Sequence, residues 1–134
     1  MKSLIPVSKA KTAYGLLSEI ATLALAEPKR MRMAVFLDTR AAVHWGDHAP
    51  ACGTVGCIAG WTCVLTGNNR GVWPVMERAM DVLGLSYKEG AALFLIPRLC
   101  NEEKQGTAVH ARHVVAHIRR FQKRYATQLK AKKV

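Results

Sequence analysis

The sequence predicts an all-α domain, a compact bundle of five or six helices. Apolar residues recur every three or four positions along most of the chain, which is the spacing of one face of a helix. Glycines and prolines separate these stretches, as they do between helices. The chain has 134 residues, half of them hydrophobic. That is the size of one domain with enough apolar side chains for a core, so we treat residues 1–134 as a single unit.

The first predicted helix spans residues 8–26, and Pro28 ends it. Its apolar face is regular and comprises Ala13, Leu16, Leu17, Ile20 and Ala24. Residues 31–37 read MRMAVFL. The hydrophobic residues at every second position of this segment are also typical of a strand. Because Pro28 can begin a helix and the neighbouring segments are helical, we expect a helix here. Residues 38–50 form a connector with one short turn near residues 41–45.

Two shorter helices are predicted next. The first covers residues 55–66 and is closed by Gly67, a residue type that commonly follows a helix. The second covers residues 74–83, with proline at its start and Gly84 as its stop.

A capping box predicts the following helix. Ser86 and Glu89 have the Ser-x-x-Glu spacing in which each side chain bonds the other residue's backbone N–H. The helix is expected to continue through Leu95 and to end before Pro97.

The last predicted helix begins near Thr107 and runs towards Lys130, covering residues 107–130. Its apolar face is a continuous stripe. This stripe comprises Ala111, Val114, Val115, Ile118, Phe121, Tyr125 and Leu129. Residues 131–134 are expected to be disordered.

Positive charge is concentrated towards the C-terminal end. The formal net charge is +11, and nine lysines and arginines but no acidic residue follow Glu103. Up to that point, eleven Lys/Arg stand against nine Asp/Glu. A long field of one sign attracts anions such as nucleic acid, nucleotides or acidic membrane. A solvated, solubilising segment is the plainer alternative.

The predicted last helix carries the candidate ligand-binding residues. One ridge lies within about 80° around the helix axis and comprises His110, His113, His117, Arg120 and Arg124. A second ridge includes Arg112, Arg119 and Lys123. Arginine binds phosphate through paired hydrogen bonds, so these ridges predict an anion-binding surface. The neighbouring arginines would repel a metal ion at His113 and His117.

Residues 52–63 read CGTVGCIAGWTC and permit several interpretations. With Thr54 as N-cap, Cys57 is expected at the third helical position, where the helix dipole favours a thiolate. Gly53 provides the turn before the helix. Gly56 and Gly60 form a close-packing face, and Trp61 is expected in the core. Tight packing is the interpretation that we favour.

Three chemical alternatives stay open for the same region, and the first is anion binding by the backbone N–H groups that follow Thr54. His44, His48, Cys52 and Cys57 supply four possible zinc ligands, although their spacing is unlike a paired zinc knuckle. A cysteine hydrolase would use Cys57 or Cys52 as nucleophile with His48 as base. Such folds bring the histidine in on a sheet, and the sequence predicts none.

Part of the chain resembles a family of small, mostly uncharacterised bacterial and bacteriophage proteins. The shared motif is Cys-Gly-Thr-x-x-Cys-x-Ala-Gly, followed by a Leu-Gly-Leu turn and a Leu-Phe pair. Here these features are Trp45, Cys52, Gly53, Thr54, Cys57, Gly60, Trp61, Leu83-Gly84-Leu85 and Leu93-Phe94. The resemblance covers roughly residues 30–97. It implies a bacterial or phage setting and no activity.

The sequence therefore predicts a non-enzymatic basic protein that binds nucleic acid or a phosphorylated small molecule through its last helix. In the setting that the resemblance implies, it would serve phage takeover of the host or counter-defence. One alternative is a sponge that binds a nucleotide immune signal at a homo-oligomer interface, and another is an inhibitor of a host defence complex. The remaining alternatives are the cysteine hydrolase and a zinc-stapled interaction domain. No cofactor is expected outside the zinc alternative.

No apolar run reaches the roughly 18–20 residues that span a bilayer, and no secretory signal is evident, so we expect a cytoplasmic location without membrane partners.

Overall fold

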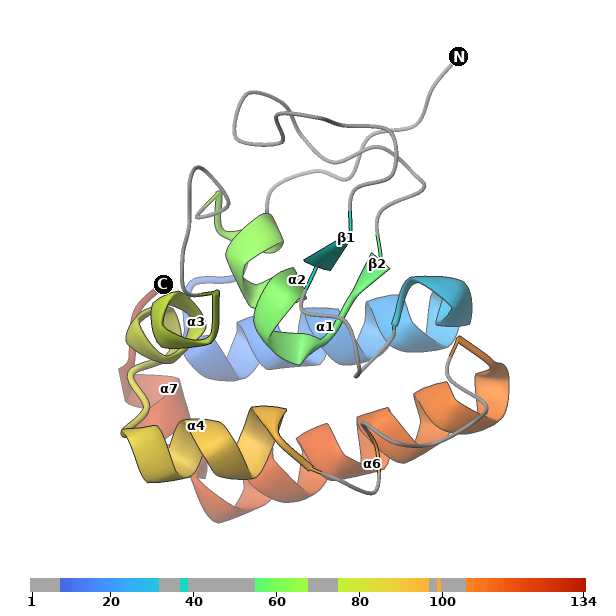
Figure 1. Cartoon of the computed structure of the whole chain (residues 1–134). Coiled ribbons are helices and arrows are strands. Elements are labelled where there is room, and N and C mark those ends of the chain that lie inside the picture. Colours follow the sequence, from blue (N-terminus) through green and yellow to red (C-terminus); the bar gives the residue numbers. More distant parts are fainter. Residues whose placement is uncertain (1–7, 32–36, 39–54, 68–74, 97–98, 100–105) are drawn as a thin grey trace.

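Helices dominate the computed structural model, which describes residues 8–31, 37–38, 55–67, 75–96, 99 and 106–134 (Figure 1). The elements in chain order are α1 (Ala13–Ala26), η1 (Pro28–Arg30), β1 (Leu37–Asp38), β2 (Val55–Gly56), α2 (Ile58–Leu65), α3 (Val75–Leu83), α4 (Tyr87–Phe94), α6 (Ala108–Arg124) and α7 (Ala126–Ala131). The predicted all-α class is confirmed, since each strand has only two residues.

The two longest described helices, α1 and α6, form the main helix–helix contact. Helix α2 packs on α1 and α3, and α4 bridges α3 to α6. Figure 1 shows α6 and α7 at the lower edge of the molecule, with α1 and α2 above them. This arrangement leaves one long side of α6 at the surface.

Helix α1 begins at Ala13, later than the predicted residue 8. Thr12 is its N-cap, and the Thr12 hydroxyl accepts a hydrogen bond from Gly15 N at 3.1 Å. The preceding residues have another backbone partner: Val134 N donates to Lys11 O at 3.2 Å and Ala13 N donates to Lys132 O at 2.9 Å. The expected disorder of residues 131–134 is therefore corrected, because they pair with the start of α1.

The pairing of β1 with β2 corrects two further expectations. The strands are antiparallel, with Leu37 opposite Gly56 and Asp38 opposite Val55. Leu37 is thus in a strand rather than at the end of a helix; residues 32–36 lie outside the described residues. Helix α2 begins at Ile58 instead of residue 55 because Val55 and Gly56 pair with β1 and Cys57 is the N-cap.

The predicted capping box is confirmed in α4. Glu89 N donates to the Ser86 hydroxyl at 3.2 Å, and Ser86 N donates to the Glu89 carboxylate at 2.8 Å. The Ser86 backbone hydrogen bond, followed by one from Gln128, lowers the pKa of Glu89. Gly84 ends α3 with a φ of +69°, a conformation that glycine adopts without strain.

The predicted last helix is divided at Tyr125 into α6 and α7. Tyr125 has a φ of −112° and a ψ of 28°, outside the helical range, yet its N–H still donates to Phe121 O at 3.0 Å. Its ring packs on Phe121 with 4.7 Å between ring centroids. Leu129 of α7 is fully buried, so the apolar stripe continues across the break.

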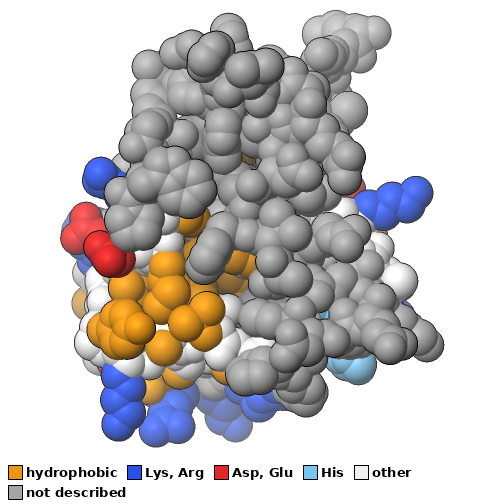
Figure 2. Space-filling model, viewed as in Figure 1, with side chains coloured by type: hydrophobic (Ala, Val, Ile, Leu, Met, Phe, Trp, Pro, Cys, Tyr) orange, Lys and Arg blue, Asp and Glu red, His pale blue; other side chains and the backbone are white. Residues whose placement is uncertain are grey.

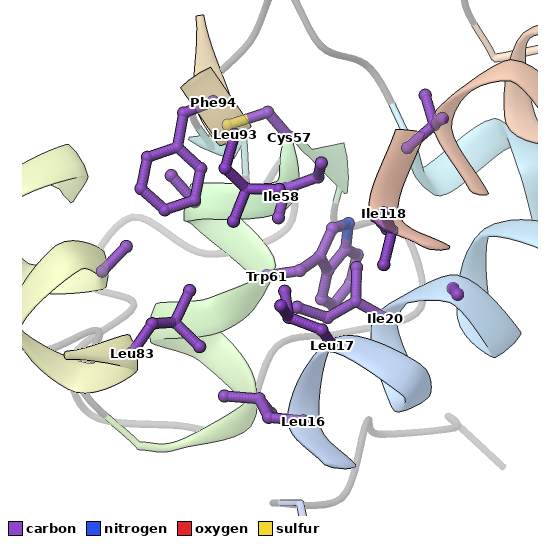
Figure 3. Packing of buried hydrophobic residues seen from close by; sticks show 14 of the residues in the cluster. Leu16, Leu17, Ile20, Cys57, Ile58, Trp61, Leu83, Leu93, Phe94 and Ile118 are labelled. Atoms are coloured by element: carbon purple, nitrogen blue, oxygen red, sulfur yellow. The ribbon is translucent and has the colours of Figure 1, made fainter. Parts of the chain in front are cut away.

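The core is centred on Trp61, which is fully buried. Figure 3 shows Trp61 among side chains from helices far apart in sequence. These include Leu16, Leu17 and Ile20 of α1, Ile58 of α2, Leu83 of α3, Leu93 and Phe94 of α4, and Ile118 of α6. The indole Nε1 donates to Arg30 O at 2.8 Å, which satisfies the one polar atom of the ring.

Within the described part of the chain, no helix combines the length and apolar character needed to cross a membrane.

Candidate anion-binding surface

Five lysines and arginines on α6 form one exposed face, which we call the α6 basic face. It consists of Arg112, Arg119, Arg120, Lys123 and Arg124, all exposed. The opposite side of the helix is buried through His110, Ala111, Val114, Ile118, Phe121 and Gln122. Burial of that side holds the helix in place and fixes the direction in which the basic face points.

Local sequence explains why α6 is stable despite its charge. Thr107 is the N-cap, and its hydroxyl accepts from His110 N at 3.3 Å. Lys123 and Arg124 lie in the last turn, where the helix dipole favours positive charge. The apolar side of α6 packs mainly against α1.

The histidine part of the predicted ridge is corrected. His110 is completely buried, and its Nε2 lies 3.1 Å from Leu99 O. His117 is half-buried, with Nε2 3.1 Å from Ala92 O and 3.2 Å from Leu93 O. These rings contact carbonyls in and beyond the last turn of α4, where helix carbonyls lack internal partners. His110 and His117 therefore join α6 to the α4 region, and His113 is the one histidine of the three with an exposed side chain.

Arg119 lies at the contact between α6 and α1. Its NH1 donates to Ser18 Oγ at 3.2 Å and to Gln122 Oε1 at 3.0 Å. Gln122 is buried and donates to Tyr14 O at 2.8 Å and to Ser18 Oγ at 2.9 Å. Sequence reasoning missed Gln122, because a glutamine beside an apolar stripe gives no periodic signal of burial.

Aromatic rings next to the basic face are covered by cations. The Arg124 guanidinium lies 5.6 Å from the centroid of the Tyr125 ring. The Lys130 ammonium lies 4.9 Å from the centroid of the Tyr14 ring. These cation–π contacts occupy ring faces on which a nucleobase would otherwise stack.

Charge is separated across the described residues. The acidic residues of the described segments belong to α1, its C-cap residue, β1, α3 and α4: Glu19, Glu27, Asp38, Glu77, Asp81 and Glu89. Helices α6 and α7 contain none. Figure 2 shows several Lys and Arg side chains along the lower edge of the molecule and others higher on its left and right sides, while most of the acidic surface visible in this view lies on the left, above the lower edge.

Cys57 and Cys63 are buried, with 1% and 0% of their surface exposed. Cys57 is the N-cap of α2 and makes no side-chain capping bond, so the expected third helical position is wrong. Gly56 belongs to β2 and does not share a helical face with the buried Gly60. Burial, and next the neighbouring Cys57, raise the pKa of Cys63 to about 12, which keeps this thiol protonated.

The Cys63 thiol lies 3.6 Å from Val75 O, at the contact between α2 and α3. The S–H is thus positioned to donate to a carbonyl in the first turn of α3. This geometry is that of a packed core thiol.

The other residues of the cysteine motif lie outside the described residues. These are Trp45, Cys52, Gly53 and Thr54, together with the possible zinc ligands His44 and His48. Among the residues that are described, no cluster of three or more His, Cys, Asp or Glu is placed to hold a metal.

Compared with protein-family models, curated proteins and solved structures, the chain matches none.

Proposed function

We propose that this protein is a non-enzymatic binding protein that engages a phosphate-bearing ligand, a nucleic acid or a nucleotide, through the α6 basic face. The observation that carries the proposal is an exposed helical face with five Lys/Arg and no acidic residue. Arginine predominates there, and its planar guanidinium suits phosphate better than the ammonium of lysine.

The spacing of the charges argues against a merely solvated helix. Arg119 and Lys123, and likewise Arg120 and Arg124, stand four residues apart. Like charges at this spacing destabilise a helix by about 0.2–0.5 kcal/mol per pair. A helix shaped only by solvation would gain from acidic residues at these positions. An anionic ligand instead removes the repulsion when it binds.

The resemblance gives this chemistry a setting. In a bacterial or phage-infected cell, a small protein of this kind would act on host nucleic acid, a nucleotide signal or a defence complex. The chemistry proposed for α6 is the same in each case, a cationic helix that binds phosphate.

Removing three cations tests the proposal. Arg112→Gln/Arg120→Gln/Lys123→Gln changes exposed residues and spares Arg119, which bonds to α1. Binding to labelled duplex DNA, single-stranded RNA and a cyclic dinucleotide is measured by fluorescence anisotropy against salt concentration. For a nucleic-acid ligand, we expect weaker binding and a logarithmic salt dependence shallower by about 2.1–2.7, because each of the three lost phosphate contacts removes about 0.7–0.9.

The matched control is Lys29→Gln/Arg78→Gln/Lys88→Gln. These residues are also exposed but lie on η1, α3 and α4, and the change in net charge is identical. The control should retain the wild-type affinity and salt dependence. Equal losses in both variants, or no salt-sensitive binding of the wild type to any of the probes, would contradict the proposal.

A further inference from the structure

The exposed cationic residues of α6 form two rows. Successive residues of an α-helix turn by about 100°. On that basis Arg112, Arg119 and Lys123 lie in one row, which we call the α1-side row because Arg119 bonds to Ser18. The other row, the α4-side row, contains His113, Arg120 and Arg124. It neighbours His117, which contacts carbonyls of α4.

A strip of small side chains separates the rows. Val109 and Ala116 occupy it, and both are exposed. The centres of the two rows are about 100° apart around the axis. The long cationic side chains of the two rows thus extend away from each other, on either side of the strip.

The two cationic rows, with the strip between them, match a groove that lies between two phosphate backbones. An α-helix with its side chains is about 10–12 Å wide, and the major groove of B-form DNA is about 12 Å wide. A helix that enters the groove along the Val109 and Ala116 strip would direct one cationic row to each backbone. The small strip residues allow close approach and offer no polar groups for reading bases.

The length of the rows favours a polymer over a single nucleotide. From Arg112 to Arg124 the helix rises by about 18 Å, over which duplex DNA carries about ten phosphates. The cations diverge from a convex surface and do not converge on one small anion.

The aromatic contacts favour a duplex over a single strand. Proteins that bind single strands stack bases on aromatic rings. Next to the basic face, the rings of Tyr14 and Tyr125 are instead covered by Lys130 and Arg124. Double-stranded RNA fits less well, since its major groove is too narrow and deep for side chains to read.

From these observations we infer that α6 lies in the major groove of duplex DNA and holds both phosphate backbones without reading sequence. The inference rests on the proposed function and names its ligand class.

The first experiment compares ligands for the full-length chain. A mixed-sequence 20-base-pair DNA duplex, the same sequence as a single strand, the corresponding RNA duplex, a cyclic dinucleotide and phosphatidylserine vesicles are tested at equal ionic strength. The DNA duplex should bind at least tenfold more tightly than the other ligands, and a scrambled duplex should bind equally well. Equal or tighter binding of the single strand, the RNA duplex or the cyclic dinucleotide overturns the inference while leaving the proposed function standing. Equal or tighter binding of the vesicles, or no binding to any of the ligands, removes both.

The second experiment tests the groove. Ala116→Trp places bulk on the strip without changing charge and should weaken duplex binding at least tenfold. Ala26→Trp, at an exposed position of α1, is the matched control and should bind as the wild type does. Contact with one backbone alone would leave Ala116→Trp unaffected, and this result would also overturn the inference.

The third experiment separates the rows. Arg112→Gln/Lys123→Gln removes two cations from the α1-side row, and Arg120→Gln/Arg124→Gln removes two from the α4-side row. Each pair should reduce the logarithmic salt dependence of duplex binding by about 2. If only one of the two variants showed a reduced salt dependence, only one backbone would be contacted. This result would contradict the two-row arrangement. Circular dichroism of each variant checks that the helices are retained.

Discussion

Individual buried polar side chains hold the helices of this protein in register. Trp61 donates to Arg30 O, and Gln122 donates to Tyr14 O. Each bond joins residues far apart in sequence and satisfies a side-chain donor that would be costly to bury unpaired. The Arg30 guanidinium, 5.9 Å from the Trp61 ring centroid, also bonds to Glu27 at 3.0 Å. Gln122 thus fixes the position of α6 relative to α1, and Trp61 joins α2 to η1.

The buried Cys63 thiol predicts a pH dependence of stability. Burial raises its pKa from 9.0 to about 12, so the folded chain keeps a proton that the unfolded chain loses. The free energy of unfolding should therefore fall as the pH rises from about 9 to 12, by up to about 1.4 kcal/mol per pH unit. Urea unfolding of the wild type and of Cys63→Ala at pH 8, 9 and 10 measures this contribution. An equal decline in both proteins would show that other groups cause it.

At the scale of elements, caps and glycines set the helix limits more than apolar periodicity does. The Ser86 and Glu89 box, the left-handed Gly84 and the Thr107 cap all define ends that the sequence indicates. Helix α1 begins later than its apolar pattern predicts because Thr12 caps the helix and the Ala13 N–H bonds to Lys132 O. A pairing partner at the other end of the chain leaves no local signal.

The capping box of α4 predicts a defined loss of stability. Ser86→Ala removes the acceptor for Glu89 N and should lower the free energy of unfolding by about 1 kcal/mol. The change in the free energy of unfolding is measured by urea unfolding at pH 7. Thr127→Ala, at an exposed position within α7, is the control and should change stability by less than about 0.5 kcal/mol. Similar values for the two variants would mean that the box does not stabilise α4.

The histidines mark the limit of helical-wheel reasoning for the candidate site. Wheel angles correctly place the five exposed Lys/Arg of α6 away from its apolar stripe. They do not reveal that His110 and His117 meet carbonyls of Leu99 and α4, because that depends on how another element packs. Sequence therefore identified the cations of the site, whereas the supporting contacts required the fold.

At the scale of the whole molecule, the fold separates its charges and joins distant parts of the chain. The acidic residues of the described segments belong to α1, its C-cap residue, β1, α3 and α4, whereas every Lys, Arg, Asp or Glu position of α6 and α7 is a Lys or Arg. The segments 11–13 and 132–134 pair through backbone hydrogen bonds. This pairing connects α7 to the start of α1, the helix against which α6 packs.

Removing the last three residues tests that connection. Deletion of residues 132–134 removes the bonds Ala13 N to Lys132 O and Val134 N to Lys11 O. The free energy of unfolding should fall by about 1–3 kcal/mol, at about 0.5–1.5 kcal/mol for each bond. Lys133→Ala/Val134→Ala preserves these backbone bonds and is the control. If thermal unfolding of the deletion variant matched that of the control, the pairing would contribute nothing measurable.

The contact between α1 and α6 also affects how the chain can fold during synthesis. At about 5–20 residues per second, the ribosome completes α6 on the order of ten seconds after α1. Throughout this interval the apolar face of α1, with Leu16, Leu17 and Ile20 fully buried in the finished fold, lacks its main partner. The nascent chain would therefore expose this face of α1 to chaperones until α6 had left the exit tunnel.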